Sequence, residues 1–152
     1  MKPMLPTLRP DLPAEGTWHY EVKYDGFRGI LSILSHDEIT LESRNGKDLL
    51  HHFPEIKEQI QSLLNNKNFP APLILDGEIV LLRSSFSTEF HELQVRGRMR
   101  NTQKIHREAT RRPVTFLAFD LLQFRQDSYI NEPYLKRKEK LREVFVQLKL
   151  PL

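Results

Sequence analysis

The segment EVKYDGFRG, residues 21–29, places Glu21, Lys23, Asp25 and Arg28 close together. A lysine amine is a nucleophile only without its proton, and burial or a nearby cation lowers its pKa. Arg28 or a bound metal could supply the cation, whereas the two acids would oppose it unless they face a ligand. Two interpretations stay open at this point: Lys23 is a nucleophile, or the segment is a solvated charged turn.

Residues 17–26 alternate between apolar and polar side chains, which predicts a strand. The apolar face would carry Trp18, Tyr20, Val22 and Tyr24, and the polar face His19, Glu21, Lys23 and Asp25. A ligand on the polar face would therefore meet the lysine and both acids. Gly26 would then permit a tight turn and a close approach of the backbone.

The stretch LILDGEIV, residues 73–80, holds two carboxylates in an otherwise apolar strand. Asp76 and Glu78 have the same parity, so they share a face. Their burial costs free energy unless a cation, a ribose hydroxyl or an arginine satisfies them. The alternative is a hairpin turn at Asp76-Gly77.

Two further stretches carry side chains suited to a nucleotide. Arg44 comes just before the turn-forming pair Asn45-Gly46, where it could reach a phosphate or a sugar, or could be incidental. Phe116 and Phe119 have opposite parity, so one ring faces a cleft unless the strand is covered on both sides. Such a ring could stack on a nucleobase, and the alternative is that both are core.

The remaining patterns indicate an α+β fold with mixed or antiparallel sheets and flanking helices. The proline-rich residues 1–16 predict an extended arm. Apolar runs predict strands at 27–34, 38–46, 72–82 and 113–124, and periodic patterns predict helices at 53–64, 86–110 and from Pro133 onward.

Composition excludes several classes of protein. A chain of 152 residues suits one domain or a piece of a larger one. No apolar run is long enough to span a membrane, and prolines near the start argue against an export signal. The lack of cysteine excludes disulfides, thiolate metal sites and cysteine nucleophiles, and it fits a reducing cytosol.

Basic side chains gather in residues 96–112. They are Arg96, Arg98, Arg100, Lys104, Arg107, Arg111 and Arg112, against the single acid Glu108. Such a cluster suits a polyanion such as a nucleic-acid backbone. The alternative is a solvated basic helix or loop.

In this order, the stretches EVKYDGFR, SRNGKDL, LILDGEIV and FLAFDLL resemble the nucleotidyltransferase (adenylation) domain of ATP-dependent DNA ligases. The similarity is greatest to bacterial ligases of non-homologous end joining, often called ligase D, and runs from about residue 3 to residue 150. It implies an ATP-grasp-like fold and a role in DNA repair and recombination.

The resemblance also implies roles for individual residues. Lys23 would attack the α-phosphate of ATP, expel pyrophosphate and hold AMP as a phosphoramidate. Glu21 would contact the adenine amino group, and Phe119 would stack on adenine. In the family, AMP then passes to a DNA 5′-phosphate, and a 3′-hydroxyl displaces it to seal the nick.

Three more residues receive roles from the same resemblance. Arg28 and Arg44 would contact the ribose or the phosphate of the DNA end. Glu78 would bind the ribose or a divalent metal, Mg²⁺ or Mn²⁺. The implied partners are nicked or broken double-stranded DNA and a Ku-like end-binding protein, in the cytoplasm at the nucleoid.

The sequence also departs from the family pattern. After Asp120 it has neither the E-G-[ILV]-V strand, whose glutamate holds metal, nor the K-x-K strand that holds the triphosphate. Lys136 and Lys138 form K-x-K, but in a predicted helix. No OB-fold domain follows, so residues 1–152 are expected to be a partial domain: an expressed fragment, a split gene or a degenerate copy.

These departures leave stand-alone activity open, and two alternatives to an active DNA ligase remain. One is a catalytically incompetent fragment that still binds nucleotide or DNA. The other is an RNA ligase or RNA-capping nucleotidyltransferase, which shares the lysine motif.

Overall fold

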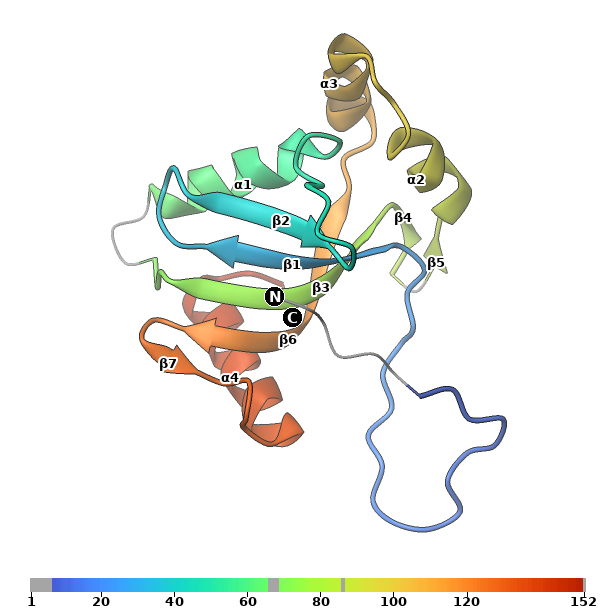
Figure 1. Ribbon diagram of the computed structural model, residues 1–152, viewed down its shortest axis with the longest axis vertical. Coiled ribbons are helices and arrows are strands. Elements are labelled where there is room, and N and C mark those ends of the chain that lie inside the picture. The colour runs from blue at the N-terminus through green and yellow to red at the C-terminus, as the bar shows by residue number, and fades with distance from the viewer. Residues whose placement is uncertain (1–6, 66–68, 86, 152) are drawn as a thin grey trace.

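A five-stranded antiparallel sheet forms the centre of the computed structural model, which describes residues 7–65, 69–85 and 87–151 (Figure 1). The strand order is β2-β1-β3-β6-β7. The strands are β1 (Phe27–Ile33), β2 (Ile39–Ser43), β3 (Leu73–Val80), β6 (Thr115–Phe124) and β7 (Asp127–Ser128), with a separate ribbon of β4 (Leu82–Ser84) and β5 (Ser87–Thr88). The helices are α1 (Pro54–Leu64), α2 (Phe90–Arg96), α3 (Thr102–Arg111) and α4 (Tyr134–Gln147).

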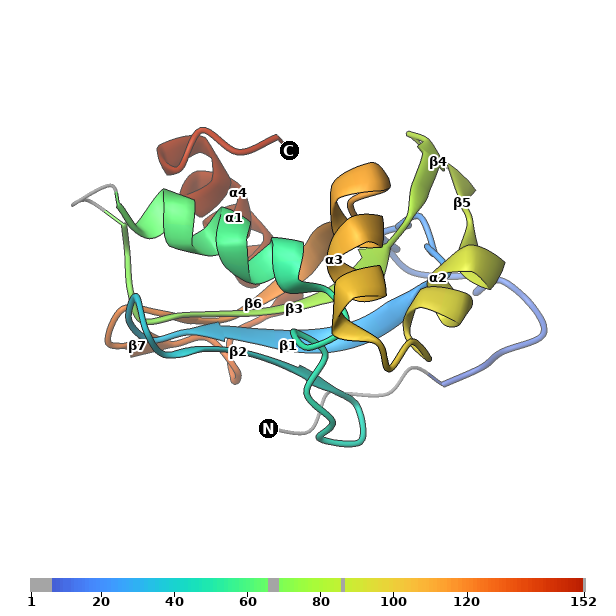
Figure 2. The same ribbon diagram turned by 90° about the horizontal axis from the view of Figure 1, so that it is seen from above.

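One face of the sheet is covered by helices. Figure 2 shows α1, α3 and α4 on the same side of the five strands. Leu31 and Leu75 point to that side, because they belong to the core that also contains Ile60 of α1 and Val144 of α4. Successive side chains of a strand alternate between faces. Arg28, three positions before Leu31, therefore lies on the opposite face.

Most of the predicted elements are confirmed, and so is the α+β class, with every strand pairing antiparallel. Helix α1 begins at Pro54, where the missing N–H of proline costs no helical hydrogen bond. Gly46 has φ +73°, the left-handed conformation that the predicted turn requires. None of the helices among the described residues is long and apolar enough to cross a membrane.

The predicted helical region 86–110 is two helices rather than one. Residue 86 lies outside the described residues, and β5 precedes α2. The break has a local cause at Asn101, whose side chain accepts a hydrogen bond from the Lys104 backbone N–H at 2.9 Å. This contact caps the start of α3, because an asparagine at that position satisfies a free helical donor.

The strand predicted over residues 17–26 is wrong. This segment has no strand conformation, and Trp18, Tyr20 and Val22 are 52%, 70% and 52% exposed. Figure 1 shows it in a long loop that projects away from the sheet and returns to it at β1. Alternation alone does not make a strand, since the backbone also needs a neighbour to hydrogen-bond with. Within the described residues, no strand pairs with this segment.

The hairpin alternative at Asp76-Gly77 is also wrong, because both residues lie inside β3. Gly77 serves packing instead of a turn. A Cβ at this position would meet the Phe116 ring at 2.5 Å. The glycine therefore lets Phe116 pack against the strand on the helix-covered face.

Arg96 is buried in the core, so it cannot be part of a basic surface as the sequence pattern predicted. It is 4% exposed, and its guanidinium lies 2.7 Å from the Glu55 carboxylate of α1. It also donates to the Arg112 carbonyl at 3.1 Å, and Glu55 accepts from the Val114 backbone N–H at 3.0 Å. This buried ion pair joins α1, α2 and the start of β6.

Candidate functional site

Arg28 and Asp76 form the most ordered part of the candidate site. The Asp76 carboxylate accepts hydrogen bonds from Arg28 Nε at 3.0 Å and Nη2 at 2.7 Å. Asp76 is almost fully buried, and this bidentate pair provides the arginine partner that the sequence required. The contact raises the pKa of Arg28, chiefly through the hydrogen bond to Asp76.

Phe119 lies against the same arginine. The Arg28 guanidinium carbon is 5.3 Å from the centre of the Phe119 ring, within the range of a cation–π contact. Of the two phenylalanines, Phe116 packs against the core and Phe119 faces the other side, as the opposite parity allowed. Thus β1, β3 and β6 bring Arg28, Asp76 and Phe119 together from distant parts of the sequence.

Glu78 lies beside this group, directly across from Arg28 in the β1–β3 register. Burial raises the pKa of Glu78 to about 7, while Arg28 and Lys23 oppose the rise and Asp76 adds to it. The Gly26 backbone lies against the Glu78 side chain and also opposes the rise of its pKa. A cation that entered the site would favour the ionised form of Glu78.

Gly26 makes that contact possible. A Cβ on Gly26 would lie 2.1 Å from the Ile79 carbonyl oxygen, which no side chain could tolerate. The predicted close approach of the backbone is therefore confirmed, and it is directed at β3. The chain just before β1 reaches Glu78 only because residue 26 has no side chain.

Glu78→Gln is expected to make the folded protein more stable at pH 8 but not at pH 4.5. The folded-state pKa of about 7 exceeds the ordinary value of 4.5, so the glutamate loses stability as the pH rises between these values. We expect a gain of about 1–2 kcal/mol above pH 7, discounted for partial solvent screening. Urea denaturation across this pH range measures it, with exposed Glu58→Gln as the control. A pH-independent difference would contradict the assignment.

Lys23 is exposed, and its pKa is raised, not lowered. Its amine lies 2.6 Å from Asp25 Oδ1, and the two side chains are 86% and 64% exposed. The hydrogen bond to Asp25 is the largest cause of the raised pKa. The expectation of a depressed pKa is therefore wrong for this conformation. The charge of Glu78 adds slightly to the rise in the pKa of Lys23.

Glu21 is held by helix α4, a contact that the sequence did not predict. Its carboxylate forms an ion pair with Lys138. The pKa of Tyr134, on the same helix, is raised chiefly by burial and further by Glu21. Lys138 also donates to the Phe119 carbonyl at 2.6 Å. The K-x-K pair was the only signal at this position, and its place in a helix, as predicted, is confirmed.

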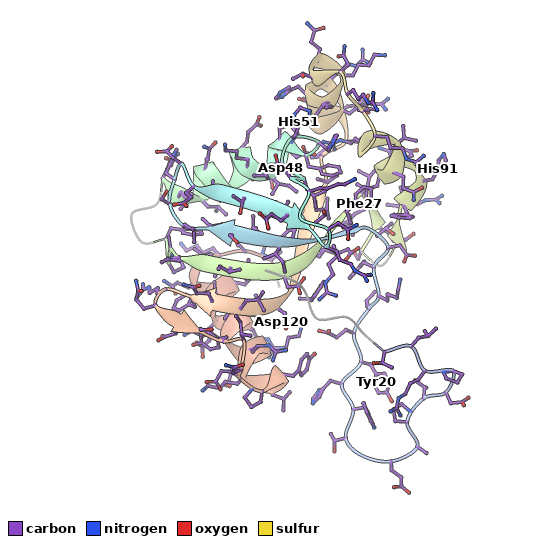
Figure 3. The ribbon with its side chains drawn as sticks, viewed as in Figure 1. Tyr20, Phe27, Asp48, His51, His91 and Asp120 are labelled. Carbon is purple, nitrogen blue, oxygen red and sulfur yellow. The ribbon has the colours of Figure 1, made fainter. Side chains whose placement is uncertain are left out.

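A shallow hollow of about 660 Å³ opens beside this contact. It is lined by His19, Tyr20 and Glu21 of the extended segment, and by Tyr134 and Lys138 among the α4 residues. Figure 3 shows Tyr20 on the loop that leaves the sheet. The hollow is thus formed between the loop and the first turns of the helix.

Arg44 stands apart from the other candidate residues. It is exposed between the end of β2 and the turn at Gly46. Within the described parts of the chain, no hydrogen bond or ion pair links it to Arg28, Glu78 or Phe119. The structure therefore assembles five of the six predicted side chains around β1, β3, β6 and α4, with Lys23 at the exposed margin.

The residues present fit a divalent metal only in part. Among the described residues, no three His, Asp or Glu side chains lie together as a metal cage. Asp76 is already engaged by Arg28, which leaves Glu78 as the available carboxylate. Mg²⁺ often binds proteins through one or two carboxylates and takes its other ligands from substrate phosphates and water. Glu78 fits that single-ligand role.

Comparison with known proteins identifies the family. The model of the ATP dependent DNA ligase domain matches residues 8–150. The chain therefore belongs to the ATP-dependent DNA ligase domain family, which confirms the resemblance of the four sequence stretches.

Its relatives are considerably longer. The chain is 45% identical over 148 residues to the bifunctional non-homologous end joining protein LigD of Bacillus subtilis, covering 97% of this chain and 24% of that protein. It is 35% identical to DNA ligase C1 of Mycolicibacterium smegmatis, covering 94% of this chain and 40% of the relative. The chain thus spans about a quarter to two fifths of these relatives.

Solved structures agree with the fold. The ligase domain of M. tuberculosis LigD superposes with a TM-score of 0.64 at 28% identity, covering 86% of this chain and 38% of that one. A mycobacterial DNA ligase D complexed with ATP and MES matches with the same TM-score and identity. That match covers 86% of this chain and 37% of the ligase D chain.

Proposed function

We propose that this chain carries the nucleotide-binding, lysine-bearing part of an ATP-dependent DNA ligase of end-joining repair. The observation that carries the proposal is the family match over residues 8–150 together with the grouping of Arg28, Asp76, Glu78 and Phe119 beside Lys23. The names of the relatives are those of DNA ligases, which favours DNA over RNA as the substrate.

Lys23 is proposed as the nucleophile. Its Nζ would attack the α-phosphorus of ATP, a P–N bond would form, and the bond to the leaving oxygen would break and release pyrophosphate. The amine must lose its proton for this reaction, and the contact with Asp25 currently favours the protonated form. We infer that Lys23 leaves Asp25 when nucleotide binds. AMP would then pass to a DNA 5′-phosphate, from which a 3′-hydroxyl displaces it.

The other site residues would bind the nucleotide and neutralise its charge. Glu21 would accept from the adenine amino group, and Phe119 would stack on the base. Arg28 and Arg44 would contact the ribose or a phosphate. Mg²⁺ held by Glu78 would supply charge neutralisation at the phosphates, where negative charge grows during phosphoryl transfer.

Incubation of the folded protein with Mg²⁺ and ATP labelled at the α-phosphate tests this proposal. We expect a covalent label that resists denaturation and is released by acid, as a phosphoramidate is. ATP labelled at the γ-phosphate should leave no label, because that phosphate departs with pyrophosphate. A folded, ATP-binding protein without label would instead support the catalytically incompetent alternative, which the exposed, protonated state of Lys23 favours.

Four basic side chains on and before α3 are proposed to contact DNA phosphates. Among the described residues, no ion pair involves the exposed Arg98, Arg100, Lys104 or Arg107, whereas Arg112 pairs with Glu92 and Arg111 with Glu108. Of the basic side chains in residues 96–112, the proposed DNA-binding surface therefore consists of these four. The end-joining name of the Bacillus subtilis relative supports broken DNA ends as the substrate. A Ku-like partner and a location at the nucleoid are proposed on the family resemblance alone.

Reversal of these four charges to glutamate should weaken binding to nicked duplex DNA and flatten its salt dependence. The slope of log K against log salt should become shallower by about 3 to 4, at ~0.9 for each phosphate contact. Fluorescence anisotropy at several salt concentrations measures this. Reversal of Lys136, which is exposed on α4 at the other end of the sheet in Figure 1, is the control for a single charge elsewhere on the surface. An unchanged slope would refute the surface.

A further inference from the structure

We propose that Lys138 of α4 is a positioning residue for adenine recognition, because it fixes Glu21 relative to Phe119. The inference rests on the proposed function, in which Glu21 reads the edge of the base and Phe119 stacks on its face. It concerns a lysine to which neither the sequence motifs nor the family resemblance gives a role.

The ammonium group of Lys138 bridges Glu21 and the backbone of Phe119. Lys138 pairs with the Glu21 carboxylate and donates to the Phe119 backbone carbonyl at 2.6 Å. An ammonium group has three N–H donors, so it can hold both partners at once. The residue expected at the edge of adenine and the residue expected at its face are therefore tied to the same atom.

Glu21 depends on this bridge because its own segment is poorly anchored. Residues 17–25 have no strand pairing, and Tyr20 and Val22 on either side of Glu21 are exposed. Among the described residues, the Glu21 side chain forms its ion pair with Lys138 of α4. The Glu21 side chain is 44% exposed and that of Lys138 only 27%, so the lysine is the more fixed partner.

The chemistry predicts selectivity for the base. A carboxylate accepts hydrogen bonds through two oxygens, so one can face Lys138 while the other accepts from the 6-amino group of adenine. Hypoxanthine has a carbonyl at this position, which a carboxylate would repel. A site that hydrogen-bonds a substrate group discriminates against the analogue that lacks it, provided the site is held in place. Lys138 would supply that constraint.

The test compares ATP with inosine triphosphate as ligands, using isothermal titration calorimetry on the full chain. Lys138→Met removes the ammonium but keeps the length and most of the packing. We expect it to lower the affinity for ATP about tenfold, the value of one charge-assisted hydrogen bond, and to leave the affinity for inosine triphosphate nearly unchanged.

Lys138→Arg should restore most of the preference for ATP over inosine triphosphate. Lys136→Met, on the same helix and paired only with Glu132 among the described residues, is the matched control.

The ratio of the two affinities separates positioning from a general structural defect, which would weaken both ligands alike. Equal loss for both nucleotides, or no loss for either, would overturn the role of Lys138. So would a gain in ATP affinity, since Lys138 would then be withdrawing Glu21 from the base. Absence of a covalent AMP label on the wild type would contradict the adenylation chemistry alone, because these measurements concern binding. A wild type that binds neither nucleotide, or both equally, would overturn the inference.

Discussion

Lys23→Arg protein is expected to carry no covalent AMP after incubation with ATP and Mg²⁺, while it still binds the nucleotide. A guanidinium keeps the positive charge of lysine but stays protonated at any accessible pH, so it cannot form the P–N bond. Removal of the group that forms a covalent intermediate should reduce the rate of labelling at least about 10³-fold. Gel autoradiography with α-labelled ATP measures the label, and calorimetry measures binding.

The matched control for this prediction is Lys57→Arg on α1, the helix that lies on the covered side of the sheet (Figure 2). It should be labelled like the wild type. Label on the Lys23→Arg protein at the wild-type level would mean that another lysine is the nucleophile. Because Lys23 is exposed and makes its contact with Asp25 alone among the described ion pairs, its replacement should not disturb folding.

Removal of one partner of the buried Arg96–Glu55 pair is the second large expected effect. Arg96→Met should lower the free energy of unfolding by about 3–5 kcal/mol, because it leaves an uncompensated carboxylate in the core. Glu55 and Arg96 side chains are 7% and 4% exposed, so water cannot replace the lost partner without a structural change. Chemical denaturation followed by circular dichroism gives the stability of each variant.

Two further variants test whether the burial of the pair, rather than its charge alone, causes this loss of stability. Arg111→Ala removes an exposed pair with Glu108 and should cost less than about 1 kcal/mol. The double variant Glu55→Gln with Arg96→Met should recover part of the loss, because no buried charge remains unpaired. A loss for Arg96→Met no larger than that for Arg111→Ala would contradict the role of the buried pair.

Local signals in the sequence predicted most elements and one close contact. The helix over Pro54–Leu64 follows from its proline start and apolar spacing, and β1 and β3 from their apolar runs. The shared face of Asp76 and Glu78 follows from strand parity, and the approach of Gly26 from its lack of a side chain. The helix, the strands and the shared face depend on residues near one another in the chain, so local patterns suffice. For Gly26 the sequence predicted the close approach, but not that β3 is the segment approached.

Other features depend on distant parts of the chain. The alternation of residues 17–26 predicts a strand, but within the described residues no neighbouring strand is available to pair with it. The arginines of residues 96–112 look alike in the sequence, yet Arg96 is buried against Glu55 of another helix. The sequence likewise could not show that Lys138, far along the chain, would reach Glu21.

The sequence by itself determined the family, most of the strand and helix pattern, and the set of candidate residues, because motif order and periodicity are local properties. Only the tertiary structure decided the electrostatic state of those residues. The pKa of Lys23 is raised by Asp25, and that of Glu78 is raised to about 7 by burial. The reason is physical, because a pKa depends on desolvation and on charges within a few ångströms. For Glu78 the packing of distant segments sets the desolvation, and for Lys23 the conformation of the loop brings the Asp25 carboxylate to the amine.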